Sequence, residues 1–150
     1  MSICDKVAVM NDGKIHQIDT PINLLNNPKT IFVSSFILGN NIINLKKNGN
    51  SYISCLGEIN CSEYLKNTGI KSMSISPKFI SIKRSESGDA IVISKEFLGE
   101  FLIYKVSING NILRVRTDIN NLLNNGDKCS LSINKNSYYF LYPGAYKEYI

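Results

Sequence analysis

The chain has 150 residues, of which 43% are hydrophobic and 19% are charged, and this balance excludes an intrinsically disordered protein. No apolar run reaches the roughly 20 residues that a membrane-spanning helix needs, and no secretion signal is visible, so we expect a cytoplasmic protein. Lysine and arginine outnumber aspartate and glutamate by 17 to 12, but they are scattered, which indicates a solvated surface rather than a dedicated basic site.

A β-hairpin is expected near the start of the chain. Residues 7–10 and 14–18 are rich in β-prone side chains, and Asn11-Asp12-Gly13 lies between them. An Asp-Gly turn between two such runs is a strong hairpin signal.

Two short helices are expected next. Thr20-Pro21 supplies an N-cap and a proline at the first helical position, which predicts a helix of about two turns. Asn27-Pro28 repeats this pattern and predicts a second helix from Lys29 to Leu38, closed by Gly39.

After Gly39 the pattern changes to short β-prone runs separated by turn residues, which predicts a small antiparallel barrel or sandwich with a boundary near 39–41. The expected strands are 42–46, 52–56, 72–76, 80–83, 90–98, 101–108, 112–117, 128–133 and 138–142. The clearest hairpin joins 104–108 to 112–116, and its alternation places Tyr104 on the core face.

The cysteines and the single histidine do not form a metal-ligand pattern. Cys4, Cys55, Cys61 and Cys129 lack the C-x-x-C spacing of zinc sites, and we interpret them as reduced thiols with Cys55 and Cys129 in the core. His16 lies on a hairpin strand, where we expect a solvent-facing structural role.

Residues 4–15 resemble the stretch that follows the switch histidine in the ABC ATPases of bacterial importers, which typically reads Asp-Arg-Ile-Ala-Val-Met-Asn-x-Gly. The resemblance continues through 17–21, Asn27-Pro28 and 32–37. The chain departs from the family pattern at Asp19, where glycine is usual, and at Leu38, which looks like an insertion. An ordered series of matches is more specific than one short motif.

The later strands resemble the transport-associated OB-like (TOBE-type) domain of polyamine, iron, sulfate and phosphonate importers. Ser76-Pro77-Lys78 stands where the family often has Arg-Pro-Glu, and Phe97-Leu98-Gly99 and Gly126-Asp127-Lys128 match recurrent segments. The resemblance implies an α+β, mainly β fold. Residues 1–39 would be the tail end of an ABC ATPase domain, and 40–150 an OB-like regulatory domain.

The resemblance implies a regulatory and dimerisation domain of the ATP-binding subunit of an ABC importer. Its parent would couple ATP hydrolysis to uptake of a polyamine, ferric iron, an inorganic anion or a phosphonate, at the inner face of the cell membrane. The chain has no G-x-x-x-x-G-K-[ST] motif, so we expect ATP and Mg²⁺ to belong to the parent, and no catalysis, cofactor or metal here. Implied partners are a second copy, the ATPase domain, permease subunits and a small effector.

Two loops and the C-terminal strand are the candidate contact regions. The loop residues are Ser76, Pro77, Lys78, Lys95, Glu96, Gly99 and Glu100. Tyr139 and Tyr142 lie in an aromatic run that fits either a core strand or a subunit contact. The resemblance also predicts that the edges of the first hairpin are unpaired, because it normally extends a sheet of the ATPase core.

Two other functions remain open. A nucleic-acid-binding barrel would use Tyr104, Lys105, Arg114 and Arg116, although Tyr104 and Lys105 are adjacent on a strand and point to opposite faces. A purely structural module would pack against the ATPase domain and sense nothing.

Overall fold

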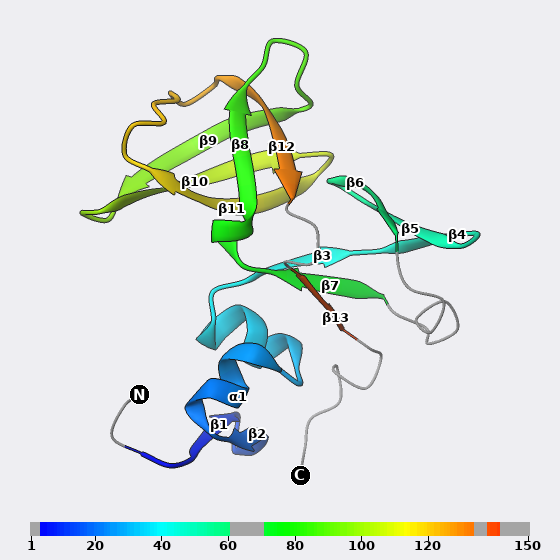
Figure 1. Cartoon of the computed structure of the whole chain (residues 1–150), viewed down its shortest axis with the longest axis vertical. Helices are drawn as coiled ribbons and strands as arrows, with labels where there is room; N and C mark the ends of the chain where they lie inside the picture. The colour runs from blue at the N-terminus through cyan, green and yellow to red at the C-terminus, as the bar shows by residue number, and fades with distance from the viewer. Residues whose placement is uncertain (1–3, 61–70, 134–137, 142–150) are drawn as a thin grey trace.

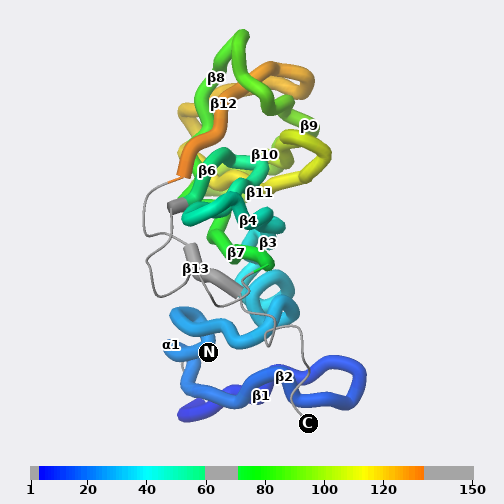
Figure 2. The backbone as a smooth tube through the Cα atoms, turned by 90° about the vertical axis from the view of Figure 1, so that its right-hand side faces the viewer, coloured from blue at the N-terminus to red at the C-terminus, as the bar shows by residue number. Residues whose placement is uncertain are grey.

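The computed structural model describes residues 4–60, 71–133 and 138–141. Its elements form an elongated molecule with a small N-terminal unit at one end and β-sheets at the other (Figures 1 and 2). They are β1 (Val7–Asn11), β2 (Lys14–Asp19), α1 (Pro21–Asn26), η1 (Val33–Ile37), β3 (Asn41–Asn44), β4 (Lys46–Asn48), β5 (Ser51–Ser54), β6 (Gly57–Asn60), β7 (Ser72–Ile75), η3 (Pro77–Phe79), β8 (Ile80–Arg84), β9 (Ala90–Phe97), β10 (Phe101–Ile108), β11 (Asn111–Asp118), β12 (Lys128–Ile133) and β13 (Tyr138–Leu141).

The first hairpin is confirmed. Strands β1 and β2 pair antiparallel through a two-residue turn in which Asp12 and Gly13 have φ values of 49° and 75°. Two positive φ angles match the right-handed twist of the strands, which is why Asp-Gly suits this turn. The pair forms a sheet of its own, so neither edge is paired with another strand in the described ranges, as predicted.

The first helix is confirmed, and the second begins later than predicted. Thr20 Oγ1 accepts a hydrogen bond from the Asn23 amide at 3.2 Å, which caps α1. The next helical turn starts at residue 31 because the hydroxyl of Thr30, not the Asn27 side chain, caps it through the Val33 amide at 3.1 Å. It continues as the π-helical turn η1, where the Leu38 amide donates to the Val33 carbonyl.

A small hydrophobic core holds this N-terminal unit together. It consists of Val9 from β1, Leu24 from α1 and Val33 from η1, with Val7 and Phe32 packed against it. The unit is therefore a hairpin with two helical turns on one face, and its core is separate from that of the sheets.

The remaining strands form three antiparallel sheets in the described part of the chain. Their orders are β11-β10-β9-β12-β8, β13-β7-β3 and β4-β5-β6. Most predicted strands are present within one or two residues. The predicted strand 42–46 is split at Leu45 into β3 and β4, which belong to different sheets, and β6 and η3 were not predicted.

The five-stranded sheet curves but is not a closed barrel. Its edge strands are β11 and β8, and no ladder joins them among the described residues. The side chain of Asn121 spans the gap, because its Nδ2 atom lies 3.1 Å from the carbonyl of Ile82 and 3.2 Å from Thr117 Oγ1. The predicted mainly β, antiparallel architecture is present. The predicted closed barrel is not formed in the described residues, and the Asn121 side chain links the two edge strands.

The main core lies between the sheets, and Tyr104 is at its centre. Tyr104 and Val106 are fully buried, while Lys105 between them is exposed. This confirms the predicted alternation of β10. The Tyr104 hydroxyl donates to the Asn121 carbonyl at 2.6 Å and accepts from the Leu123 amide at 2.9 Å.

Polar side chains join the N-terminal unit to the sheets. Ser34 of η1 is hydrogen bonded to Ser74 of β7, and Asn40 Nδ2 donates to both hydroxyls. Gly39 has a φ of 63°, the left-handed conformation predicted for the end of the helix. The segment around Gly39 thus joins the N-terminal unit to β7.

Candidate functional site

The turn η3 presents a lysine beside the edge strand β11. Pro77 is buried and starts the turn, whereas the next residue, Lys78, is exposed. The Lys78 ammonium lies 4.9 Å from the centre of the Phe79 ring. This cation–π contact restrains the lysine without neutralising its charge.

Arg116 of β11 is held in a similar way. Its guanidinium lies 3.7 Å from the centre of the Phe101 ring at the start of β10. Within the described ranges Arg84 forms an ion pair with Asp127, but neither Lys78 nor Arg116 forms one with any carboxylate. Two restrained and unpaired cations therefore lie at the edge of the sheet.

Two clefts meet at these cations. The first, the junction cleft, has a volume of about 500 Å³ and lies between the N-terminal unit and the sheets. Its lining residues are Leu25, Asn26, Ile37, Leu38, Asn40, Ser76, Lys78, Phe79 and Arg116. The second has a volume of about 710 Å³ and is also lined by Lys78 and Arg116, but includes the carboxylates of Glu100 and Asp118.

The structure brings together some of the predicted loop residues. Ser76 lines the junction cleft, Glu100 lines the second cleft, and Lys78 lines both. Lys95 is directed elsewhere, because its ammonium lies 3.4 Å from the carbonyl of Leu123.

The other predicted contact residues do not line these clefts. Glu96 is exposed on β9, and Gly99 has a φ of 81° in the β9–β10 turn. Tyr139 pairs with Ser74 through the backbone of β13, which agrees with a strand, and Tyr142 lies outside the described residues.

Arg116 and Phe101 were not among the predicted contact residues. The alternation of β11 places Arg116 on the outer face, but only the fold shows that η3 packs beside that strand. For the nucleic-acid alternative, the full burial of Tyr104 removes the proposed stacking platform.

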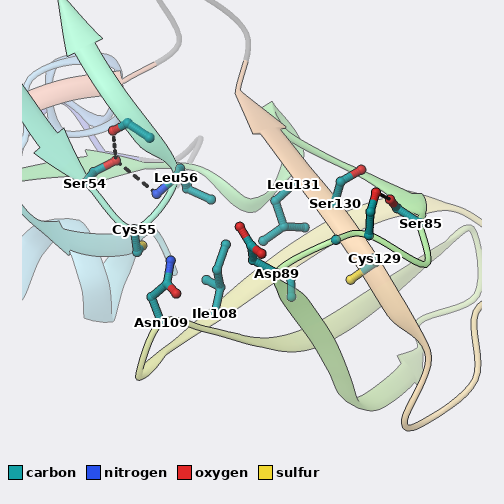
Figure 3. Close-up of a pocket in the computed structure, with 14 residues that line it drawn as sticks. Ser54, Cys55, Leu56, Ser85, Asp89, Ile108, Asn109, Cys129, Ser130 and Leu131 are labelled. Atoms are coloured by element: carbon teal, nitrogen blue, oxygen red, sulfur yellow. Dashed lines mark hydrogen bonds between the residues drawn. The ribbon is translucent and has the colours of Figure 1, made fainter.

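A further hollow of about 390 Å³ lies between the β5–β6 turn and the five-stranded sheet (Figure 3). Asp89 is the charged residue in its lining, and Cys55 and Cys129 also face it. Burial raises the pKa of both thiols, which disfavours the nucleophilic thiolate. Cys129 is buried as predicted, whereas Cys55 is only half-buried.

The prediction for His16 is wrong. The side chain is only 6% exposed, packs 4.7 Å from the Phe32 ring and places Nδ1 3.3 Å from Thr30 Oγ1. It is buried because Thr30 and Phe32 pack against this side of β2. Its Nε2 atom has no hydrogen-bond partner, and no group of three or more metal-binding side chains occurs in the residues described.

The outer face of the first hairpin is apolar and uncovered. Ala8 pairs with Ile18 and Met10 pairs with Ile15 across the two strands. Met10 is 56% exposed and Ile18 is 53% exposed, although the opposite face of β1 buries Val9. We call Ala8, Met10, Ile15 and Ile18 the hairpin face.

Comparison with known proteins reveals partial relatives. No protein-family model matches the chain. It is 51% identical over 53 residues to the spermidine/putrescine import ATP-binding protein PotA of Bacillus thuringiensis (strain Al Hakam), which is 35% of this chain and 15% of that protein. It is 35% identical over 92 residues to the sn-glycerol-3-phosphate import ATP-binding protein UgpC 3 of Agrobacterium fabrum, which is 60% of this chain and 26% of that protein.

A third relative agrees with these two. The PotA protein of Desulfitobacterium hafniense is 49% identical over 43 residues, or 29% of this chain and 12% of that protein. The chain thus matches only a small part of each relative, and these relatives are ATP-binding proteins of ABC importers. Within the described ranges, none of the helices has the length and apolar character needed to span a membrane.

Proposed function

We propose that the chain is a regulatory and dimerisation domain of the ATP-binding subunit of an ABC importer, with its first 39 residues contributing to the ATPase domain. The proposal rests on sequence identity: in the alignments with two import ATP-binding proteins, about half of the aligned residues are identical. The parent would couple ATP hydrolysis to uptake of a small solute. The relatives are named for two different solutes, so the proposal does not choose a cargo.

The hairpin face supports this assignment. A two-stranded sheet is rarely stable alone, and this one covers only one face with its own helical turns. The exposed apolar side chains of Met10 and Ile18 are therefore available to a partner surface. The occupant that we propose is the nucleotide-binding core, because the aligned part is at most 26% of these relatives, and the rest of such a protein includes that core.

Binding to a truncated relative tests the proposal. Bacillus PotA lacking the stretch that aligns with this chain would be titrated with the 150-residue protein by calorimetry. We expect saturable binding that Ile18→Asp weakens by roughly tenfold or more, because it places a charge on the apolar contact. Ile112→Asp is the matched control, since Ile112 is 67% exposed on β11, a strand of the five-stranded sheet and not of the β1–β2 hairpin. No binding, or equal loss in both variants, would refute the proposed contact.

Dimerisation has its own test. Light scattering over a concentration series measures whether the mass rises from that of one 16.8 kDa chain towards twice that value. We expect the mass to rise with concentration, either for the chain alone or for its complex with the truncated relative. A mass that stays at one copy in both samples would remove dimerisation from the proposed function.

A further inference from the structure

We propose that the junction cleft binds a small organic oxyanion, such as a phosphate monoester, with its charged head between Lys78 and Arg116 and its apolar part against the N-terminal unit. This inference extends the proposed function. The regulatory effect of the ligand rests on that proposed function. The binding site itself is argued from the cleft alone.

The charges of the junction cleft favour an anion. Lys78 and Arg116 line it, and none of its other lining residues is acidic or basic. Neither cation has a carboxylate within ion-pair distance in the ranges that the structure describes. Contacts with the aromatic rings of Phe79 and Phe101 reduce the side-chain freedom that the two cations would lose when an anion binds.

The neighbouring cleft is a poorer anion site although it shares both cations. Glu100 and Asp118 also line it, so its formal charges cancel. The two carboxylates would repel an anion on that side of Arg116. An oxyanion is therefore expected on the side that faces the N-terminal unit.

Neutral donors and apolar walls complete the junction cleft. Asn26 and Ser76 line it, and neither side chain is hydrogen bonded within the described residues. An amide and a hydroxyl can donate to oxyanion oxygens that the two cations leave free. Leu25, Ile37 and Leu38 supply the aliphatic part of the lining. A volume of about 500 Å³ leaves room for an organic group beside the charged head.

A ligand in this cleft would influence how the N-terminal unit is arranged relative to the sheets. Its lining residues come both from α1 and the end of η1 and from η3 and β11. A ligand that contacts both sides stabilises one arrangement of the N-terminal unit relative to the sheets. If the N-terminal unit is part of the ATPase domain, ligand binding is thermodynamically coupled to the arrangement of that domain.

Calorimetry with phenyl phosphate and inorganic phosphate tests the site on the chain alone. We expect saturable binding of both, with phenyl phosphate roughly tenfold tighter because its ring buries apolar surface. Lys78→Gln and Arg116→Gln should each weaken binding by roughly tenfold, since each removes a charge-assisted contact from an exposed residue. Lys83→Gln is the matched control, because it removes an exposed charge from β8 outside both clefts.

The outcomes separate this inference from the proposed function. Absence of binding, equal affinity for the two ligands, or the same loss in Lys83→Gln as in Lys78→Gln would overturn the junction site. None of these results depends on the truncated relative. Conversely, failure of the chain to bind that relative would overturn the proposed function and leave the measured ligand affinities unchanged.

Discussion

The side chain of Asn41 is hydrogen bonded to the backbone of Arg114 at both ends of its amide. Its Nδ2 atom donates to the Arg114 carbonyl, and its Oδ1 atom accepts from the Arg114 amide, each at 2.8 Å. Asn41 begins β3, and Arg114 lies in the middle of the edge strand β11. The Asn41 side chain thereby makes the two hydrogen bonds that a paired strand would make to Arg114. It joins two sheets that share no strand pair in the described chain.

Replacing Asn41 by alanine should destabilise the protein by about 1–3 kcal/mol, because two backbone groups of Arg114 lose their partner. Chemical denaturation followed by circular dichroism measures the change. Asn44→Ala is the control, since Asn44 lies on the same strand but is exposed. Equal stability of the two variants would show that the Asn41 contact contributes nothing.

Removing the Tyr104 hydroxyl should also destabilise the fold. Tyr104→Phe leaves the ring in place but deprives the Asn121 carbonyl and the buried Leu123 amide of their partner. The expected cost is about 1–3 kcal/mol by thermal or chemical unfolding. Ser132→Ala, which removes an exposed hydroxyl from β12, should change stability far less. A smaller effect for Tyr104→Phe than for Ser132→Ala would contradict this role.

Gly88 is predicted to tolerate no side chain. A Cβ atom at this position would lie 2.1 Å from the carbonyl oxygen of Cys129, so the backbone of the β8–β9 loop or of β12 must move. Gly88→Ala should cost about 1–3 kcal/mol or more in unfolding free energy. Glu86→Ala changes an exposed residue of the same loop and should be nearly neutral. An unaffected Gly88→Ala variant would mean that this close approach is absent.

The carboxylate of Asp19 should make a pH-dependent contribution at the junction of β2 and α1. The Asn23 side-chain amide and then the Thr20 backbone amide donate to it and lower the pKa of Asp19 below 3.8. A lowered folded-state pKa means that the stabilisation is present above the unfolded-state pKa and is lost as the pH falls through the folded-state value.

An NMR titration of the side-chain carboxyl carbon checks this pKa directly. We expect Asp19 to titrate below 3.8 in the native protein and to move upward in Asn23→Ala, because the largest cause of the shift is removed. Asn125→Ala, an exposed change elsewhere, should leave it unaltered. A native Asp19 pKa at or above 3.8 would contradict the hydrogen bonds seen here.

Local turn chemistry was readable from the sequence. Asp12-Gly13 and Asn109-Gly110 all take positive φ, as hairpin turns with two central residues require, and the strands beside them follow. The late start of the second helix was missed because Thr30 and Asn27 are both competent caps. Tertiary contacts fix this segment, because the Gln17 side chain of β2 is hydrogen bonded to the Asn27 carbonyl and to the Lys29 amide.

The candidate site was only partly predictable, for a related reason. The resemblance pointed to Ser76, Lys78 and Glu100, but sequence carries no signal that Arg116, nearly 40 residues after Lys78, would lie beside it. The alternation of β11 identified the exposed face, yet the contact depends on η3 packing against the sheet edge. His16 was misjudged because residues 30–32 fold back over β2.

The regulatory role is tested most directly by the ATP hydrolysis rate of Bacillus PotA that lacks the aligned stretch. The rate would be measured with and without the 150-residue chain. We expect a saturable change in rate, with half-saturation at the chain concentration that equals the calorimetric dissociation constant. Ile18→Asp should shift half-saturation to a higher concentration, and Ile112→Asp should not. A rate that stays constant at concentrations where the two proteins are fully bound would contradict a regulatory role.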